Sequence, residues 1–384
     1  MARPAERDPI FVDQTTLRAV AKTTLSITQP DLRRIGWALG LFAAHRMVYA
    51  GVRMGRALDD VLFPGYRDRD PGEPIFIVAA PRSGTTFLHR LMSLDDDFAH
   101  FKLYHTILPS VSIIRLIHGL ERLDKRVGGP LRWALDKLEG LAFDGWDGIH
   151  QLGFSRPEED EGLFVLTLLS PGLYLLLHEL DAAHEAGFVD TLPAPVRERL
   201  ARYYRDSVQR IFEAEQSDGQ LLDKSVLMAG RLETMRTAFP QARFVHLVRH
   251  PYKSIPSFVS MFRAAWAAVS PSLPEDGAPS RRLAMLAIDY YKRMHRARSE
   301  LGPGKMTTIR FDDLVSAPEA TLERIYAWLD RPLTDDVRRR VREELARADK
   351  HTSSHSYSLE QYGLSKGFIA HELREVFDTY GFEP

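Results

Sequence analysis

Short apolar runs alternate along the chain with longer amphipathic stretches, and this pattern predicts strands separated by helices. Strand-like runs occupy residues 75–80, 242–248 and 306–311, and the first of them is wholly apolar. Strands separated by helices form a parallel sheet with helices on both faces. The pattern therefore predicts an α/β fold of three layers, α/β/α, around a central and mainly parallel sheet.

Two other regions lie outside this alternation. Residues 1–72 are predicted to form an N-terminal helical extension that ends in a polar linker, and residues 73–384 are predicted to form a larger domain. Within the larger domain, residues 100–220 are expected to be a large and mostly helical insertion.

The helix expected around residues 34–60 is amphipathic. At 100° per residue, its polar side chains fall within an arc of about 140°. They are His45, Arg46, Arg53, Arg56, Asp59 and Asp60. Leu39, Val48 and Leu58 fall outside this arc and form the predicted apolar face. Two interpretations are open: a surface helix packed on the larger domain, or a helix whose arginines hold it on an anionic membrane as a peripheral contact.

Composition narrows the classes of function. The 384 residues carry a formal net charge of −1, which argues against a nucleic-acid partner. The chain has no cysteine, so disulfides and thiolate metal sites are excluded. The N-terminus lacks the apolar run of a signal peptide, and the stretches 36–52 and 163–177 do not suit a bilayer span. A cytoplasmic protein is the expectation, and the oligomeric state is left open.

The strongest chemical signal is the polar loop after the first apolar run. Residues 74–91 have the pattern of a strand, a tight loop and a helix, so backbone N–H groups and the helix dipole favour an anion such as phosphate. The loop residues expected at this site are Arg82, Ser83, Gly84, Thr85 and Thr86. Thr85 stands where a Walker loop has its lysine, so this P-loop-like segment is poorly equipped for a triphosphate with its metal.

A second motif follows the strand expected at 242–248. Arg249 ends this strand, and Ser257 lies eight positions later. A phosphate dianion favours a planar guanidinium with several donors together with a short neutral donor.

These motifs, in this order, resemble those of the sulfotransferases that use 3′-phosphoadenosine 5′-phosphosulfate (PAPS). The resemblance covers about residues 74–380 and is nearest to the tyrosylprotein-type loop, Pro-Arg-Ser-Gly-Thr-Thr, in a bacterial branch of the family. Segments 156–161, 309–318 and 355–364 look like further parts of that branch. Phe311 stands where the family often carries Tyr.

The resemblance implies that residues 73–384 form a sulfotransferase catalytic domain. It implies transfer of a sulfuryl group from PAPS to a hydroxyl or amine of a small-molecule or lipid acceptor, with release of adenosine 3′,5′-bisphosphate (PAP) and no metal. The first loop would hold the 5′-phosphosulfate, and Arg249 with Ser257 the 3′-phosphate. Arg82 and Lys224 would neutralise the charge that develops on the leaving phosphate.

Several residues are candidates for the base that deprotonates the acceptor. Relatives place His or Glu shortly after the first helix, and His105 has that position. An imidazole has a near-neutral pKa, which suits a base. The branch more often has Glu there, so His105 departs from its pattern. His100 and the acidic residues Glu158 and Glu159 are the alternatives.

The leucine-rich stretch 163–177 leaves the acceptor open. If one face of this stretch lines the cleft, the acceptor is apolar, such as a lipid, sterol or phenol; otherwise these leucines are ordinary core. Two further functions remain alternatives: a P-loop kinase or nucleotide-binding protein, and a non-catalytic nucleotide-binding module. The missing Walker lysine and the Arg249–Ser257 pair favour the sulfotransferase.

Overall fold

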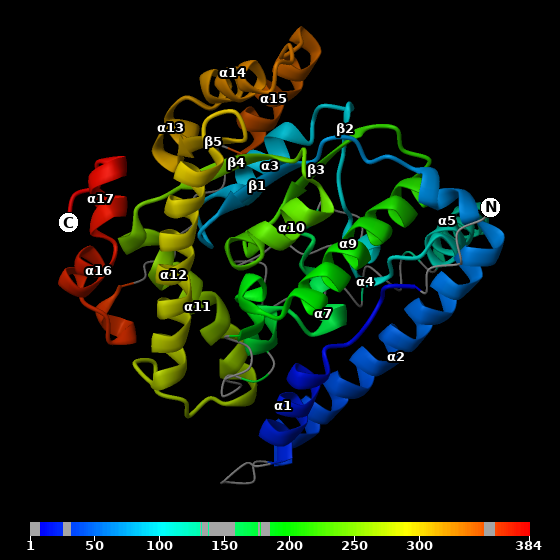
Figure 1. The fold of residues 1–384 in the computed structure, drawn as a ribbon, viewed down its shortest axis with the longest axis horizontal. Coiled ribbons are helices and arrows are strands. Elements are labelled where there is room, and N and C mark those ends of the chain that lie inside the picture. Colours follow the sequence, from blue (N-terminus) through cyan, green and yellow to red (C-terminus); the bar gives the residue numbers. More distant parts are fainter. Residues whose placement is uncertain are drawn as a thin grey trace.

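A computed structural model describes residues 8–25, 32–130, 132, 137, 158–175, 177, 185–348 and 358–384 (Figure 1). Among these residues, five parallel strands form one sheet in the order β2-β3-β1-β4-β5. The strands are β1 (Ile75–Ala79), β2 (Phe98–Ala99), β3 (Gln220–Lys224), β4 (Arg243–Val248) and β5 (Met306–Arg310). The predicted α/β fold with a parallel sheet is confirmed.

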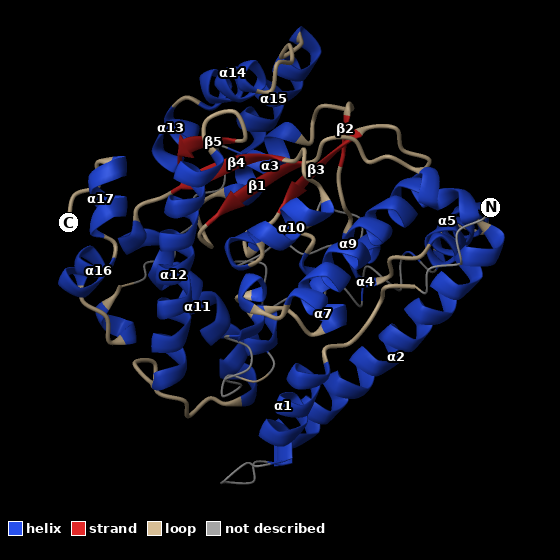
Figure 2. Ribbon diagram, in the orientation of Figure 1, coloured by secondary structure: helices blue, strands red, loops and turns tan. Residues whose placement is uncertain are grey.

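Helices cover both faces of the sheet (Figure 2). One face packs against α3 (Thr85–Met92), α14 (Pro318–Trp328) and α15 (Asp335–Ala348), and the other against α9 (Ala194–Glu215) and α12 (Ala278–Leu301). Side chains of β1 alternate between the two layers, because successive residues of a strand point to opposite faces. Ile75 and Ile77 pack with the first group of helices, and Phe76 and Val78 with the second. β1 is therefore the centre of the molecule.

Further α-helices surround this centre. They are α1 (Gln14–Leu25), α2 (Leu32–Leu62), α4 (Leu103–Ile107), α5 (Val111–Arg126), α7 (Glu161–Thr167), α10 (Leu232–Ala238), α11 (Pro251–Val269), α13 (Phe311–Ser316), α16 (Lys366–Glu372) and α17 (Arg374–Tyr380). Where it is described, the predicted insertion at 100–220 is mostly helical. Residues 156–157 and 355–357 of the segments that resemble the bacterial branch lie outside the described residues. Within the described ranges, no helix is both long and apolar enough to cross a membrane.

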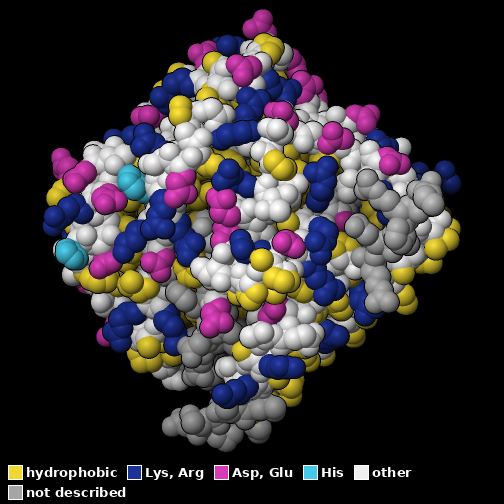
Figure 3. Space-filling view, in the orientation of Figure 1, with side chains coloured by type: hydrophobic (Ala, Val, Ile, Leu, Met, Phe, Trp, Pro, Cys, Tyr) yellow, Lys and Arg dark blue, Asp and Glu magenta, His cyan; other side chains and the backbone are white. Residues whose placement is uncertain are grey.

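α2 turns part of its predicted polar face toward the interior. The side chains of Arg56 and Asp59 are fully buried, whereas Leu39 and Leu58 of the predicted apolar face are 51% and 52% exposed. Figure 3 shows hydrophobic side chains along the edge of the molecule that α2 forms. At these four positions the structure is the reverse of the expectation that the polar side chains face solvent.

A buried network of arginines and aspartates explains this reversal. Arg210 Nη1 of α9 lies 2.8 Å from Asp59 Oδ2, and Arg56 Nη2 lies 2.5 Å from Asp206 Oδ2. Asp59 also accepts a hydrogen bond of 2.9 Å from the backbone N–H of Val111, the first residue of α5. Both guanidinium groups are fully buried, so each depends on its carboxylates for compensation of its charge. The network therefore joins α2, α5 and α9.

Asp59→Ala is expected to lower the free energy of unfolding by about 3–5 kcal/mol, because it takes a carboxylate from the buried Arg210 guanidinium. Urea denaturation measures this change. Arg67→Ala is the control, because it removes an exposed ion pair with Asp60 and should cost less than about 1 kcal/mol. Equal losses in the two variants would contradict the dependence of the buried Arg210 guanidinium on this carboxylate.

Candidate active site

The loop after β1 depends on a glycine and a close contact. Arg82 and Gly84 have φ angles of 65° and 93°. A Cβ atom at Gly84 would lie 2.4 Å from the ring of Phe311, so glycine is required where the loop passes the start of α13. α3 begins at the next residue, Thr85. Backbone N–H groups therefore gather at the carboxyl end of β1, in the arrangement by which helix N-termini bind anions.

Two hydroxyl groups stabilise the backbone at the carboxyl ends of β1 and β4 from inside the protein. The buried Ser83 hydroxyl donates to the carbonyl of Ala80 at 2.7 Å. The hydroxyl of Tyr291 donates to the carbonyl of Arg249 at 2.7 Å. Burial raises the pKa of Tyr291 to about 12, so the group remains a donor at neutral pH. The side chain of Ser83 thus supports the loop from within the protein and does not line the cleft.

Two arginines and a serine converge beside the loop. Arg82 Nε donates to Ser257 Oγ at 3.1 Å, and Arg249 Nη1 donates to the carbonyl of Arg82 at 3.1 Å. The Arg249 guanidinium carbon lies 4.3 Å from the centre of the Phe311 ring. Burial, together with the positive charge of Arg82, lowers the pKa of Arg249. Two guanidinium groups whose charges act on each other and that line one cleft favour the binding of an anion.

Lys224, the last residue of β3, joins the loop after β1 to the acidic segment 158–161. Its Nζ donates to Thr86 Oγ1 at 3.1 Å and lies 2.8 Å from Glu159 Oε1. The Lys224 side chain is 1% exposed and that of Glu159 is 17% exposed. The ion pair therefore lies at the edge of the protein interior, with the carboxylate as its more accessible member.

Asp160 anchors the acidic segment in the core. It accepts hydrogen bonds from the hydroxyls of Tyr204 and Ser225 at 3.1 and 2.9 Å, and Arg231 lies 3.5 Å away. Burial raises the pKa of Asp160 to about 6, even though the charge of Arg231 opposes this. A buried side chain with this many polar partners fixes the backbone around it, and so fixes the position of Glu159.

These elements surround one cleft of about 560 Å³. The predicted site residues that line it directly are Arg82, Gly84, Thr85, Thr86 and Arg249. Lys224 and Ser257 reach it through hydrogen bonds to Thr86 and Arg82. Apolar lining residues include Leu103, Leu175, Val226, Leu227, Phe258, Met261 and Phe262. The cleft thus combines positive charge and backbone N–H groups at the ends of the strands with apolar walls.

The structure does not bring His105 into this cleft. Its side chain is 1% exposed, its Nδ1 accepts the backbone N–H of Lys102 at 3.1 Å, and its Nε2 lies 2.9 Å from Glu215 Oε1. Burial lowers the pKa of His105, so the imidazole is neutral at neutral pH. One ring nitrogen then acts as acceptor and the other as donor, and both already have a protein partner.

Helical geometry explains where His105 points. α4 presents Leu103 and Thr106 to the cleft, whereas His105 and His100 line a separate cavity. Neighbouring residues of a helix differ by 100° in direction, so a position in the sequence does not specify which of them meets a cleft. Glu158, in contrast, lines the cleft, and so does Glu159. The link of Glu159 to Lys224 joins segments far apart in the sequence, and no local pattern indicates it.

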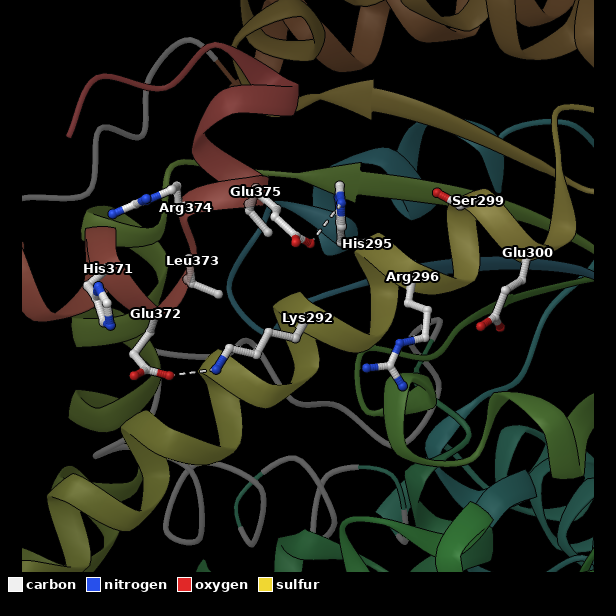
Figure 4. Close-up of a pocket in the computed structure, with 11 residues that line it drawn as sticks. Lys292, His295, Arg296, Ser299, Glu300, His371, Glu372, Leu373, Arg374 and Glu375 are labelled. Carbon is white, nitrogen blue, oxygen red and sulfur yellow. Dashed lines mark hydrogen bonds and ion pairs between the residues drawn. The ribbon is translucent and has the colours of Figure 1, made fainter.

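A larger cavity of about 640 Å³ lies between α12 and the C-terminal helices α16 and α17 (Figure 4). Lys292 of α12 lies 2.6 Å from Glu372, and His295 lies 3.8 Å from Glu375. Basic and acidic side chains therefore pair across this cavity. None of the described residues that line it is a predicted site residue, and no strand ends in it. The candidate active site is therefore the smaller cleft.

Known sequences resemble this chain over most of its length. A model of the Sulfotransferase family matches residues 74–133 and 173–335. Omega-hydroxy-beta-dihydromenaquinone-9 sulfotransferase Stf3 of Mycobacterium bovis is 25% identical over 323 residues, which are 81% of this chain and 75% of that protein. Stf3 of Mycobacterium tuberculosis matches to the same extent.

Solved structures share the fold. Sulfotransferase STF9 from Mycobacterium avium superposes with a TM-score of 0.74 at 19% identity, with 99% of each chain covered. Sulfotransferase STF1 from Mycobacterium tuberculosis has a TM-score of 0.69 at 19% identity, with 94% of this chain and 91% of that chain covered. The family model matches more than half of the chain and includes the loop after β1, Lys224 and Arg249. The chain therefore belongs to the Sulfotransferase family and is a sulfotransferase enzyme.

Proposed function

We propose that this sulfotransferase uses PAPS as its donor and transfers the sulfuryl group to a hydroxyl of an apolar acceptor, with release of PAP. The observation that carries this proposal is the convergence in one cleft of an anion-binding loop, the Arg82 and Arg249 guanidinium groups and the Lys224–Glu159 ion pair. A sulfuryl donor with two phosphate-type groups needs this distribution of positive charge.

The two anionic ends of PAPS correspond to two parts of the cleft. Backbone N–H groups at the start of α3 and the Arg82 guanidinium suit the 5′-phosphosulfate. Arg249 and Ser257 suit the 3′-phosphate. Ser257 Oγ accepts a hydrogen bond from Arg82, so its own proton is left to donate to a phosphate oxygen. Thr85 in place of the Walker lysine counts against the kinase alternative.

Glu159 is the base in the proposed reaction. Its carboxylate takes the proton of the acceptor hydroxyl while the acceptor oxygen bonds to sulfur. The bond from sulfur to the phosphate oxygen breaks, and the phosphate of PAP keeps its electron pair. Lys224, which lies 2.8 Å from the carboxylate, and Arg82 stabilise the negative charge on that phosphate. His105 is the alternative base, which the sequence favours and the cleft lining does not include.

The walls of the cleft favour an acceptor with a hydrocarbon part. Leu103, Leu175 and Phe262 are among the apolar residues that line it. Stf3 of Mycobacterium bovis acts, by its name, on a hydroxylated dihydromenaquinone. Both observations support an apolar alcohol as the acceptor of this enzyme.

We also propose that the outer face of α2 lies on an anionic membrane. Its exposed apolar side chains include Trp37, Leu39, Met47, Met54, Leu58 and Val61. Arg46 and Arg53 are exposed on the same helix, whereas Asp59 is buried and Asp60 pairs with Arg210. Figure 3 shows hydrophobic and basic side chains together along this edge. A face with this composition suits the interface of an anionic bilayer.

Arg249→Ala is expected to raise the KM for PAPS about 10- to 100-fold with little change in kcat, because it removes a charge-assisted contact present in ground and transition states alike. Arg236→Ala, at an exposed position of α10, is the control. PAP at ~100 times its Kd should stabilise the wild type by about 2.7 kcal/mol in thermal unfolding, and the same concentration should stabilise Arg249→Ala less. Stabilisation by ATP with Mg²⁺ in place of PAP would support the kinase alternative.

Glu159→Gln is expected to lower kcat by about 10²- to 10⁴-fold with little change in the affinity for PAP, because the amide cannot accept the proton. Glu233→Gln, at an exposed position of α10, is the control acid. His105→Ala separates the two candidates. A loss of this size in His105→Ala, with near-normal kcat in Glu159→Gln, would reassign the base to His105.

Met54→Glu is expected to weaken binding to vesicles that contain phosphatidylserine by about tenfold, because it places a negative charge where an apolar side chain meets the lipid. Vesicle flotation measures this binding, which should also fall as salt is added. Val315→Glu, at an exposed apolar position of α13, is the matched control. The same loss in both variants, or no binding by the wild type, would refute the membrane contact.

A further inference from the structure

A second cavity of about 390 Å³ lies behind α2, and we call it the apolar chamber. Leu41, Phe42 and Val48 of α2 form part of its wall, and Val165 of α7 forms another part. Among the described residues that line it, His45 has the only polar side chain. Its volume lies in the range of ligand pockets, about 300–1,000 Å³. The chamber thus has the size and the chemistry of a site for hydrocarbon.

The apolar chamber adjoins the active-site cleft. Leu103 of α4 and Gly162 of α7 line both cavities. A Cβ atom at Gly162 would lie 2.5 Å from Thr106 Oγ1, and Thr106 lines the cleft. Gly162 therefore allows α7 to approach α4 closely at the place where the two cavities meet.

We propose that the apolar chamber binds the hydrocarbon chain of the acceptor while the hydroxyl of the acceptor lies in the cleft near Glu159. This inference rests on the proposed function, because it needs an acceptor hydroxyl in the cleft. It specifies the acceptor as an alcohol with a long, uncharged chain. A chain that passes Leu103 and Gly162 exchanges water for apolar walls, which is favourable for every methylene buried.

The surroundings of His45 suit an uncharged occupant. Its Nε2 lies 3.3 Å from the carbonyl oxygen of Leu166, and its Nδ1 is buried with no hydrogen-bond partner in the described structure. Burial lowers the pKa of His45, which leaves the imidazole neutral at neutral pH. The described lining therefore offers no charge to pair with a charged head group, and a neutral chain fits it better.

The apolar chamber reaches the surface on the side of α2. Ala44 lines the chamber and is also exposed, and Met47 on the outer face of the same helix is 74% exposed. With this outer face on a bilayer, a membrane-borne alcohol enters the chamber without crossing bulk water. The chamber then connects the membrane to the cleft.

Alcohols of different chain length test the chamber. With PAPS as donor, kcat/KM should rise from propanol to dodecanol by about fourfold for each methylene buried, until the chain fills the chamber. Val165→Phe narrows the chamber and should lower kcat/KM for dodecanol about tenfold or more, with propanol unchanged. Ala44→Phe also narrows the chamber, but from an exposed position of α2, where folding is not at risk. This variant should likewise lower kcat/KM for dodecanol with propanol unchanged.

Val315→Phe, at an exposed position of α13, is the matched control and should leave kcat/KM unchanged for both alcohols. Equal kcat/KM for propanol and dodecanol in the wild type would overturn the inference while leaving the proposed function intact. Absence of transfer to every alcohol would contradict the proposed function instead. Binding of a fluorescent long-chain alcohol then decides the inference: it should weaken about tenfold in Val165→Phe and Ala44→Phe, and unchanged binding in both variants would overturn it.

Discussion

The parallel register of β1 with its two neighbours sets the position of the charged groups in the cleft. Ile77 pairs with Lys224 of β3, and Ala79 pairs with Leu247 of β4. Neighbouring strands lie about 4.8 Å apart, so Lys224 and Arg249 end up on either side of the loop that follows β1. Along the chain, β1 is followed by β2, which lies on one side of it in the sheet, whereas β4 lies on its other side. The carboxyl end of β1 is therefore the switch point, where open α/β sheets bind ligands. The position of the proposed anion site is therefore a consequence of strand order.

Buried ion pairs then fix the helices around the carboxyl ends of these strands. Asp59 with Arg210 holds α2 and α9 together, and Asp160 with Arg231 holds the segment that carries Glu159. Removing charges from water is costly, so each group is compensated by several partners. These pairs give position more than stability: they determine which face of α2 meets solvent and where the acidic segment meets the cleft.

Local patterns predict β1, β4 and β5, the loop and its phosphate chemistry, because all of these depend on neighbours in the sequence. β3 is not among the three runs identified from the sequence. β2 is only two residues long and has no pattern of its own. Arg46 and Arg53 of the predicted polar face of α2 are exposed, whereas Arg56 and Asp59 of the same face are buried. The helical period alone therefore does not say which residues of α2 are buried. That choice depends on Asp206 and Arg210, which lie far away in the sequence. The placement of His105 outside the cleft has the same cause, since the facing of a short helix is set by tertiary contacts.

The Lys224–Glu159 ion pair reconciles two demands of the proposed reaction. A base and a cation must both lie near the transferred group, yet much of the cleft wall is apolar, and an isolated charge is costly beside it. At 2.8 Å each charge compensates the other before any substrate binds. An anionic donor then offers Lys224 a second partner, so one cation serves both the carboxylate and the leaving phosphate. Because electrostatic interactions strengthen in surroundings of low polarity, the apolar walls proposed to select the acceptor also strengthen the effect of these charges.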